Sequence, residues 1–104
     1  MPSTSATYRV QIQDAYQQWK SIYGEEKQLP GLEYNSNQMF WISYGSVSCA
    51  EYTKDFIHHL NKNDEHSLDE ARVNIPLRNS PSFAKDFHCH SGSRMNPKQK
   101  CNVW

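Results

Sequence analysis

The feature that most constrains the fold of this chain is an amphipathic pattern between Tyr8 and Tyr23. Its apolar residues recur at spacings of three and four, which places them on one side of an α-helix. Gly24 follows directly and supplies a C-terminal stop. We therefore expect a helix whose aromatic face covers a core, formed by Ile12, Ala15, Tyr16, Trp19, Ile22 and Tyr23.

Two further helices are predicted in the middle of the chain. Asn35 or Ser36 can cap a helix that runs from about Asn37 to Val47, and this segment is apolar on nearly every side. Such a composition predicts deep burial, and its small residues would let another element come close. A third, shorter helix is expected from Tyr52 to Leu60.

The connections are polar or turn-rich. Residues 25–37 hold a Pro-Gly turn whose leucines, Leu29 and Leu32, are expected to cover the core. The stretch from Asp64 to Arg72 reads as a polar linker, and residues 73–75 read as a short β-like piece ended by Pro76.

A last short helix is expected near the C-terminus. Ser80 suits the N-cap position and Pro81 the first helical position, so a helix of about two turns should follow. Together these segments predict a mainly α fold with short irregular or β-like connections.

Composition excludes several classes of partner. The 104 residues are enough for one small domain, and the formal charge balances at zero without a basic or acidic block. Nucleic-acid surfaces and polybasic membrane patches both need a local excess of lysine and arginine. No apolar run approaches the roughly 18 to 20 residues of a membrane helix. The first five residues also lack the apolar core of a signal peptide. We expect no nucleic-acid partner, no direct membrane contact and no targeting segment.

Cysteine usage leaves two alternatives open. Cys49, Cys89 and Cys101 make an odd number. In a cytosolic protein they would be ordinary thiols. In a secreted protein, at least one of them would pair outside the chain or stay free. His88, Cys89, His90 and Cys101 could form a four-ligand structural zinc site, but their spacing matches no common zinc pattern.

Candidate chemistry gathers between Asp64 and Arg72. An imidazole such as His66, oriented by Asp64, can donate a hydrogen bond to an oxygen that gains negative charge. Arg72 offers a charged fork to a carbonyl or a carboxylate. Spacing alone favours structural or solvated roles for such residues, and the chain contains no His-Glu-x-x-His zinc helix.

Several motifs, in order and spacing, give the chain a specific resemblance. From about Asp14 to Trp104 it resembles the C-terminal end of the neprilysin and endothelin-converting-enzyme family of zinc metalloendopeptidases. The motifs that carry the resemblance are Glu25-Glu26-Lys27-Gln28-Leu29-Pro30-Gly31-Leu32, Asp64-x-His66-Ser67-x-x-x-x-Arg72, Asn79-Ser80-x-x-Phe83, Phe87-His88-Cys89 and Met95-Asn96-Pro97-x-x-Lys100-Cys101-x-Val103-Trp104.

The resemblance implies an architecture and a setting. Residues 1–104 would be a single helical C-terminal segment of a larger zinc-peptidase catalytic domain. Residues 1–7 would be an unmatched leader, and residues 8–104 the peptidase-like region. Family members are membrane-anchored or secreted enzymes that trim small peptides, so the resemblance implies an extracellular or cell-surface location and peptide substrates.

The resemblance also implies residue roles. His66 would hydrogen-bond the oxygen of the tetrahedral intermediate, and Asp64 would hold that histidine. Arg72 would grip a substrate backbone carbonyl, and Val47 would form a wall of the pocket for the side chain after the scissile bond. Two positions depart from the family pattern: Ser48 replaces a usual tryptophan and Leu68 a common proline, which implies a wider or more polar pocket and a less rigid loop.

The family's zinc ligands lie upstream of the region that this chain resembles, on a His-Glu-x-x-His helix and a Glu-x-x-x-Asp motif that this sequence lacks. The resemblance thus implies zinc in the full-length enzyme and none bound by this chain alone. The missing N-terminal part would be a partner, and Cys49, Cys89 and Cys101 would form disulfides with partners outside the chain. We expect the chain alone to be inactive, with exposed apolar surface on the helix from Met39 to Val47. The alternative is a non-catalytic short isoform that acts as a peptide-binding or interaction module.

Overall fold

The computed structural model describes the backbone of residues 4–63 and 68–101, with side chains from Ile12 onward within these ranges. Within them the chain is built from helices, and the β-pairing described is one isolated antiparallel bridge between Ser93 and Asn96. The mainly α prediction is therefore confirmed. The helices are α1 (Thr4–Tyr23), α2 (Ser36–Ser46), α3 (Lys54–Asn63), α4 (Asp69–Arg78) and α5 (Pro81–Asp86).

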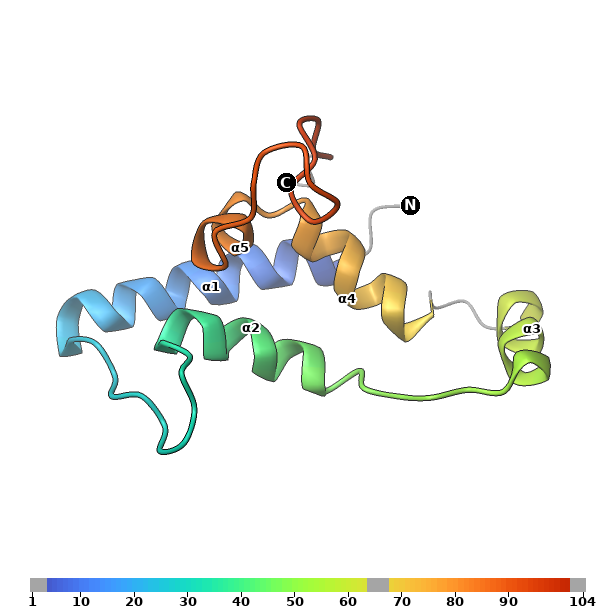
Figure 1. Ribbon diagram of the computed structural model, residues 1–104, viewed down its shortest axis with the longest axis horizontal. Helices are drawn as coiled ribbons and strands as arrows, with labels where there is room; N and C mark the ends of the chain where they lie inside the picture. The colour runs from blue at the N-terminus through green and yellow to red at the C-terminus, as the bar shows by residue number, and fades with distance from the viewer. Residues whose placement is uncertain (1–3, 64–67, 102–104) are drawn as a thin grey trace.

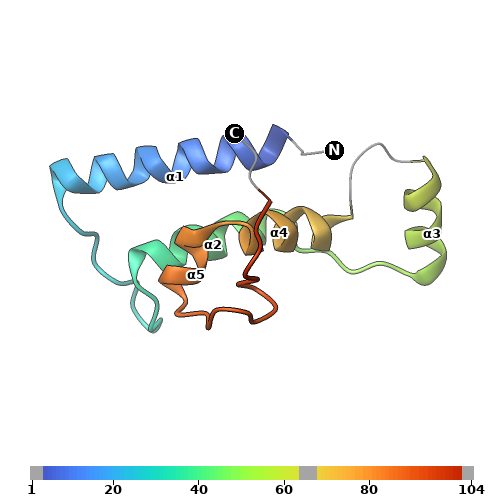
Figure 2. The same cartoon turned by 90° about the horizontal axis from the view of Figure 1, so that it is seen from above.

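The helices form an elongated arrangement (Figure 1), with principal extents of 46 × 33 × 25 Å. Helix α1 runs along one side of a layer made by α2, α4 and α5, as the view from above shows (Figure 2). Within that layer α5 packs against both α2 and α4. The segment after α5 loops over α4 and α5, while α3 stands apart at the far end (Figure 1).

A small core lies where α2, α4 and α5 meet. Among the described residues the buried hydrophobic side chains are Trp41, Leu77 and Ala84, one from each of these helices. The Trp41 indole Nε1 donates a hydrogen bond to Asp86 Oδ2 at 2.7 Å, and its ring meets Phe83 edge-on with centroids 5.8 Å apart. This tryptophan therefore joins α2 to α5 through both apolar and polar contacts.

Side-chain caps fix the starts of α2 and α5. The Asn35 side chain accepts from the Gln38 backbone N–H at 2.9 Å, and the Gln38 side chain accepts from the Asn35 backbone N–H at 3.1 Å. This reciprocal capping box satisfies two backbone donors that a helix start leaves without partners. At α5, Ser80 Oγ accepts from Phe83 N and Pro81 begins the helix. Both predicted helix starts are confirmed.

The predicted β-like piece at residues 73–75 is wrong, because α4 continues through it to Arg78 with Pro76 inside the helix. Proline has no N–H, so Pro76 cannot bond the carbonyl of Arg72 four residues earlier. The Tyr44 hydroxyl of α2 donates to that carbonyl at 3.1 Å instead. A tertiary hydrogen bond thus replaces the missing helical one. Residues 69–72, expected in a polar linker, form the first turn of this helix.

Burial is shallower than the sequence patterns predicted. On the expected core face of α1, Ile22 and Tyr23 are 74% and 71% exposed. Leu29 and Leu32 in the following connection are also exposed. Deep burial of the segment 37–47 is wrong as well, because Trp41 is the buried residue of α2. The expected exposure of apolar side chains on this segment is confirmed at Ile42 and Val47.

Candidate functional site

Arg72, the predicted substrate-binding arginine, lies in the first turns of α4 with a side chain that is 44% exposed. Its Nη1 atom is 3.9 Å from Asp69 Oδ1, one helical turn earlier. The other oxygen of that carboxylate, Oδ2, accepts a hydrogen bond from the Tyr52 hydroxyl in the connection before α3. Arg72 is thus contacted by Asp69 on its own helix and, at its carbonyl, by Tyr44 of α2, while Tyr52 is linked to it through Asp69.

We call Tyr44, Tyr52, Asp69 and Arg72 the Arg72 cluster. Sequence reasoning identified only its arginine. An acidic residue three positions before Arg72 was a usable signal, since side chains at that spacing meet on a helix. It was missed because residues 64–72 were interpreted as a linker without helical periodicity. The two tyrosines carried no sequence signal, because their contacts join segments 17 and 28 residues apart.

Of the other predicted catalytic and substrate-binding residues, the structure describes only Val47. Asp64 and His66 lie outside the described residues, so their catalytic roles stay predictions. Val47 is the C-cap of α2, and the residue is 87% exposed. The end of α2 lies against α4. A Cβ atom added at Gly45 of α2 would lie only 3.7 Å from Val73 Cγ1 of α4. Val47 and Arg72 therefore sit on two helices that touch, as the small residues of α2 led us to expect.

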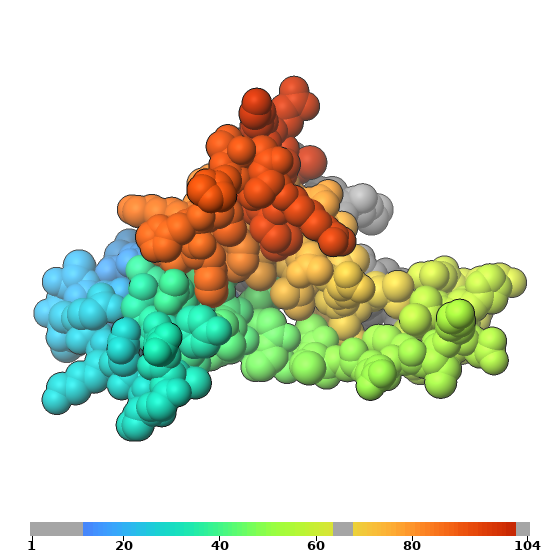
Figure 3. Space-filling view, in the orientation of Figure 1, coloured from blue at the N-terminus to red at the C-terminus, as the bar shows by residue number. Residues whose placement is uncertain are grey.

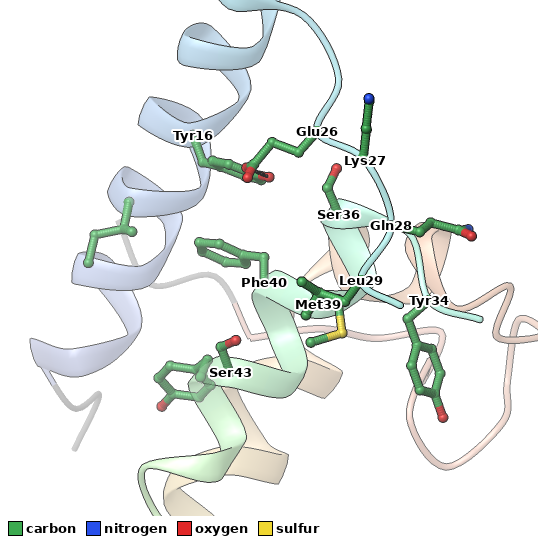
Figure 4. Close-up of a pocket in the computed structure, with 12 residues that line it drawn as sticks. Tyr16, Glu26, Lys27, Gln28, Leu29, Tyr34, Ser36, Met39, Phe40 and Ser43 are labelled. Carbon is green, nitrogen blue, oxygen red and sulfur yellow. Dashed lines mark hydrogen bonds between the residues drawn. The ribbon is translucent and has the colours of Figure 1, made fainter. Parts of the chain in front are cut away.

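A cavity of about 520 Å³ lies between α1, the connection to α2, and α2 itself (Figure 4). Sequence reasoning did not predict it. The rings of two lining residues, Tyr16 and Phe40, stack on each other with centroids 5.6 Å apart. The Tyr16 hydroxyl donates to Glu26 Oε1 at 2.6 Å, and burial together with this bond raises the pKa of Tyr16. The lining residues are Ile12, Tyr16, Glu26, Lys27, Gln28, Leu29, Tyr34, Ser36, Met39, Phe40, Ser43 and Tyr44.

Lys20 ties the two helices together at the edge of this cavity. Its side chain is only 9% exposed, and its ammonium group donates to Ser36 Oγ at 3.0 Å and Asn37 Oδ1 at 2.8 Å. It also pairs with Glu25 Oε2 at 2.7 Å. The hydrogen bonds from Lys20 and Ser36 lower the pKa of the Glu25 carboxyl. A buried ammonium needs such partners, so this network fixes the start of α2 against α1.

The part of the chain that the structure describes does not bring together enough side chains to hold a metal ion. No group of three or more histidine, cysteine, aspartate or glutamate side chains converges there. The structure therefore does not bring His88, Cys89, His90 and Cys101 together as zinc ligands. The three cysteines are free thiols, Cys49 and Cys101 exposed and Cys89 partly buried. No helix in the described ranges is long and apolar enough to cross a membrane.

Comparison with known proteins identifies the family. The chain is 48% identical over 90 residues to neprilysin-2 of Drosophila melanogaster and 42% identical over 90 residues to mouse (Mus musculus) neprilysin. It is 41% identical over 90 residues to endothelin-converting enzyme 1 of Bos taurus. Each alignment covers 86% of this chain but only 12% of the relative. Residues 6–103 match the sequence model of the family described as Peptidase family M13. The chain therefore belongs to peptidase family M13.

Proposed function

We propose that this chain is the C-terminal segment of a neprilysin-like zinc metalloendopeptidase that cleaves small peptides outside the cell. The observation that carries the proposal is the match of residues 6–103 to peptidase family M13. Because the chain spans only 12% of the length of the relatives aligned with it, most of such an enzyme would lie in residues outside this sequence. Those residues would be the segment's principal partner.

Two of the proposed residue roles stabilise the transition state, and two bind the substrate. His66 would donate a hydrogen bond to the oxygen that becomes negative as water adds to the scissile carbonyl, and Asp64 would keep the imidazole oriented. Arg72 would hold a backbone carbonyl of the peptide through its guanidinium fork. Val47 would contact the substrate side chain after the scissile bond. The exposure of Arg72 and Val47 on touching helices supports their availability to a peptide.

Zinc, when bound, would polarise the scissile carbonyl and its attacking water. The resemblance assigns its ligands to a His-Glu-x-x-His helix and a Glu-x-x-x-Asp motif that this sequence lacks, so we assign them to the part of the enzyme outside this chain. Cys49, Cys89 and Cys101, which are free thiols here, would pair with cysteines in that same part.

The direct test uses the purified chain, a zinc salt and a quenched fluorescent peptide. We expect no turnover above the buffer rate, with or without a chelator. Turnover that a chelator abolishes would show that the chain builds a complete metal site, and it would overturn the proposed dependence on residues elsewhere.

A second test uses a full-length peptidase that carries this segment. His66→Ala should slow kcat by about 10² to 10³ with little change in peptide affinity, as the loss of an oxyanion donor usually does. Arg72→Ala should mainly weaken peptide binding. A His66 variant that loses binding and turnover equally would contradict the assigned role. Lys62→Ala, on exposed α3, serves as the control.

The second candidate is a module that binds peptides without cutting them. It is favoured by the exposure of both predicted substrate-binding residues, Arg72 and Val47. Peptide binding by the isolated chain, lost in Arg72→Ala and kept in His66→Ala, would support this candidate. Binding that is unchanged in Arg72→Ala would count against both assignments of the arginine.

A further inference from the structure

The Arg72 guanidinium is not an isolated positive charge. Its helix is fixed by Tyr44, which supplies the hydrogen bond that Pro76 cannot give to the Arg72 carbonyl. Its side chain faces Asp69 Oδ1 at 3.9 Å. The backbone position is thus set by one neighbour, and the side chain's electrostatic surroundings by another.

Asp69 is held more firmly than an ordinary carboxylate on a helix surface. Its side chain is 24% exposed, and Oδ2 accepts the Tyr52 hydroxyl from a segment 17 residues away. It also lies in the first turn of α4, where the helix dipole favours a negative charge. Rotating Asp69 away from Arg72 would break the bond to Tyr52. The negative charge therefore stays beside the guanidinium.

We propose that Asp69, anchored by Tyr52, is a specificity-determining residue that makes Arg72 accept neutral carbonyl groups and reject carboxylates. This inference rests on the proposed role of Arg72 in binding peptides. A carbonyl oxygen carries no net charge and can take a free guanidinium N–H beside Asp69. A carboxylate in the same place would lie within a few ångströms of the Asp69 charge, and like charges that close repel.

Asp69 differs from the neighbouring acidic residue, Glu70, in its position relative to Arg72. Glu70 also lies in the first turn of α4, but its side chain is exposed and points elsewhere on the helix, since adjacent residues are about 100° apart. Glu70→Gln and Asp69→Asn remove the same amount of charge from the same helical turn. Only the second should change the selectivity at Arg72.

The experiment compares two short apolar peptides that differ only in a free C-terminal carboxylate or an amide. Their dissociation constants are measured by titration with the full chain. We expect the wild-type chain to prefer the amide, and Asp69→Asn to shift the amide-to-acid ratio toward the acid by about tenfold. Glu70→Gln should leave the ratio unchanged. Tyr52→Phe should move it in the same direction as Asp69→Asn, by less. Circular dichroism checks that each variant keeps its helices.

A second readout needs no peptide. The side-chain Nε–Hε resonance of Arg72 is followed by NMR during titration with acetate, after assignment with Arg72→Lys. We expect a saturable shift in Asp69→Asn and a much weaker response in the wild type and in Glu70→Gln. If Asp69→Asn and the wild type respond alike, the inference is overturned.

The two measurements separate this inference from the proposed function. If Arg72→Ala leaves binding of both peptides unchanged while acetate still distinguishes Asp69→Asn from the wild type, the proposed role of Arg72 fails and the charge selectivity stands. If Arg72→Ala weakens binding but the amide-to-acid ratio is the same in Asp69→Asn and the wild type, the role of Arg72 stands and the selectivity fails.

Discussion

The layer formed by α2, α4 and α5 differs sharply from α3 and the connections on either side of it. The layer contains Trp41, Leu77 and Ala84, the buried hydrophobic residues among those described. Helix α3, described over its full length, has no buried residue, and it projects from the rest of the molecule in the space-filling view (Figure 3). The predicted substrate-binding residues flank α3 and its connections in the sequence. Val47 comes directly after α2, and Arg72 lies in the first turns of α4. The packed layer therefore contributes Tyr44 to the surroundings of Arg72, and the connection before α3 contributes Tyr52, which holds Asp69.

The strongest test of this comparison is Trp41→Ala set against Phe56→Ala. Trp41 is 4% exposed and is bonded to Asp86, whereas Phe56 on α3 is 47% exposed. Removing a buried tryptophan leaves a cavity and costs about 3–5 kcal/mol of unfolding free energy. Removing the exposed phenylalanine should cost less than about 1 kcal/mol. Urea denaturation followed by tyrosine fluorescence and circular dichroism measures both. Equal losses would mean that α3 contributes to the core.

The link between α1 and the packed layer is tested by Lys20→Met. The substitution keeps the apolar stem but removes the hydrogen bonds to Ser36 and Asn37 and the ion pair with Glu25. A loss of about 1–3 kcal/mol is expected, because polar partners lose a nearly buried donor. Lys27→Met, at an exposed position in the following connection, is the matched control and should be close to neutral. Thermal unfolding curves measure both variants, and a neutral Lys20→Met would mean that the other contacts of α1, such as the Tyr16–Phe40 stack and the Gln17–Asn37 hydrogen bond, hold it in place.

A smaller effect is expected at the start of α2. Asn35→Ala removes one half of the capping box with Gln38 and should cost about 0.5–2 kcal/mol. Asn61→Ala, at an exposed position within α3, should change stability by a few tenths of a kcal/mol at most. Guanidinium denaturation with both variants measures the difference. If the two substitutions cost the same, the cap is not what fixes the start of α2.

The smallest effect concerns pH. Lys20 and Ser36 hold the pKa of Glu25 below its ordinary value of 4.5. A group whose pKa is lowered by folding stabilises the folded state above its unfolded pKa, and this stabilisation is lost as the pH falls through the folded pKa. Stability should therefore decline below about pH 4.5, and less steeply in Glu25→Gln. Melting temperatures across pH 3 to 7 test this, and identical profiles for the two chains would contradict it.

Sequence patterns predicted the helical segments well where local chemistry decides them. Gly24 marks the end of α1, whereas Asn35 and Ser80-Pro81 mark the starts of α2 and α5. Each acts through backbone hydrogen bonding, which depends on a few neighbouring residues. The prediction failed at residues 73–75. Pro76 argued against a helix there, and the Tyr44 hydroxyl that compensates for it lies 28 residues away from Arg72.

The candidate site was also predicted only in part. Arg72 was found from its chemistry and from the family resemblance, and Val47 from the resemblance alone. Asp69 and Tyr52 were not found, although the first lies one helical turn from Arg72. The cavity beside Tyr16 also escaped prediction, because it is formed by two helices and the connection between them.

The sequence by itself determined that this chain is mainly helical, where α1 ends, where α2 and α5 begin, and which enzyme family it resembles. These properties follow from local periodicity, capping chemistry and motifs of fixed spacing. The tertiary structure decided which of the apolar faces are buried, how α4 passes through Pro76 and what surrounds Arg72. Those outcomes depend on contacts between residues far apart in the chain, and such contacts exist only once the helices have packed.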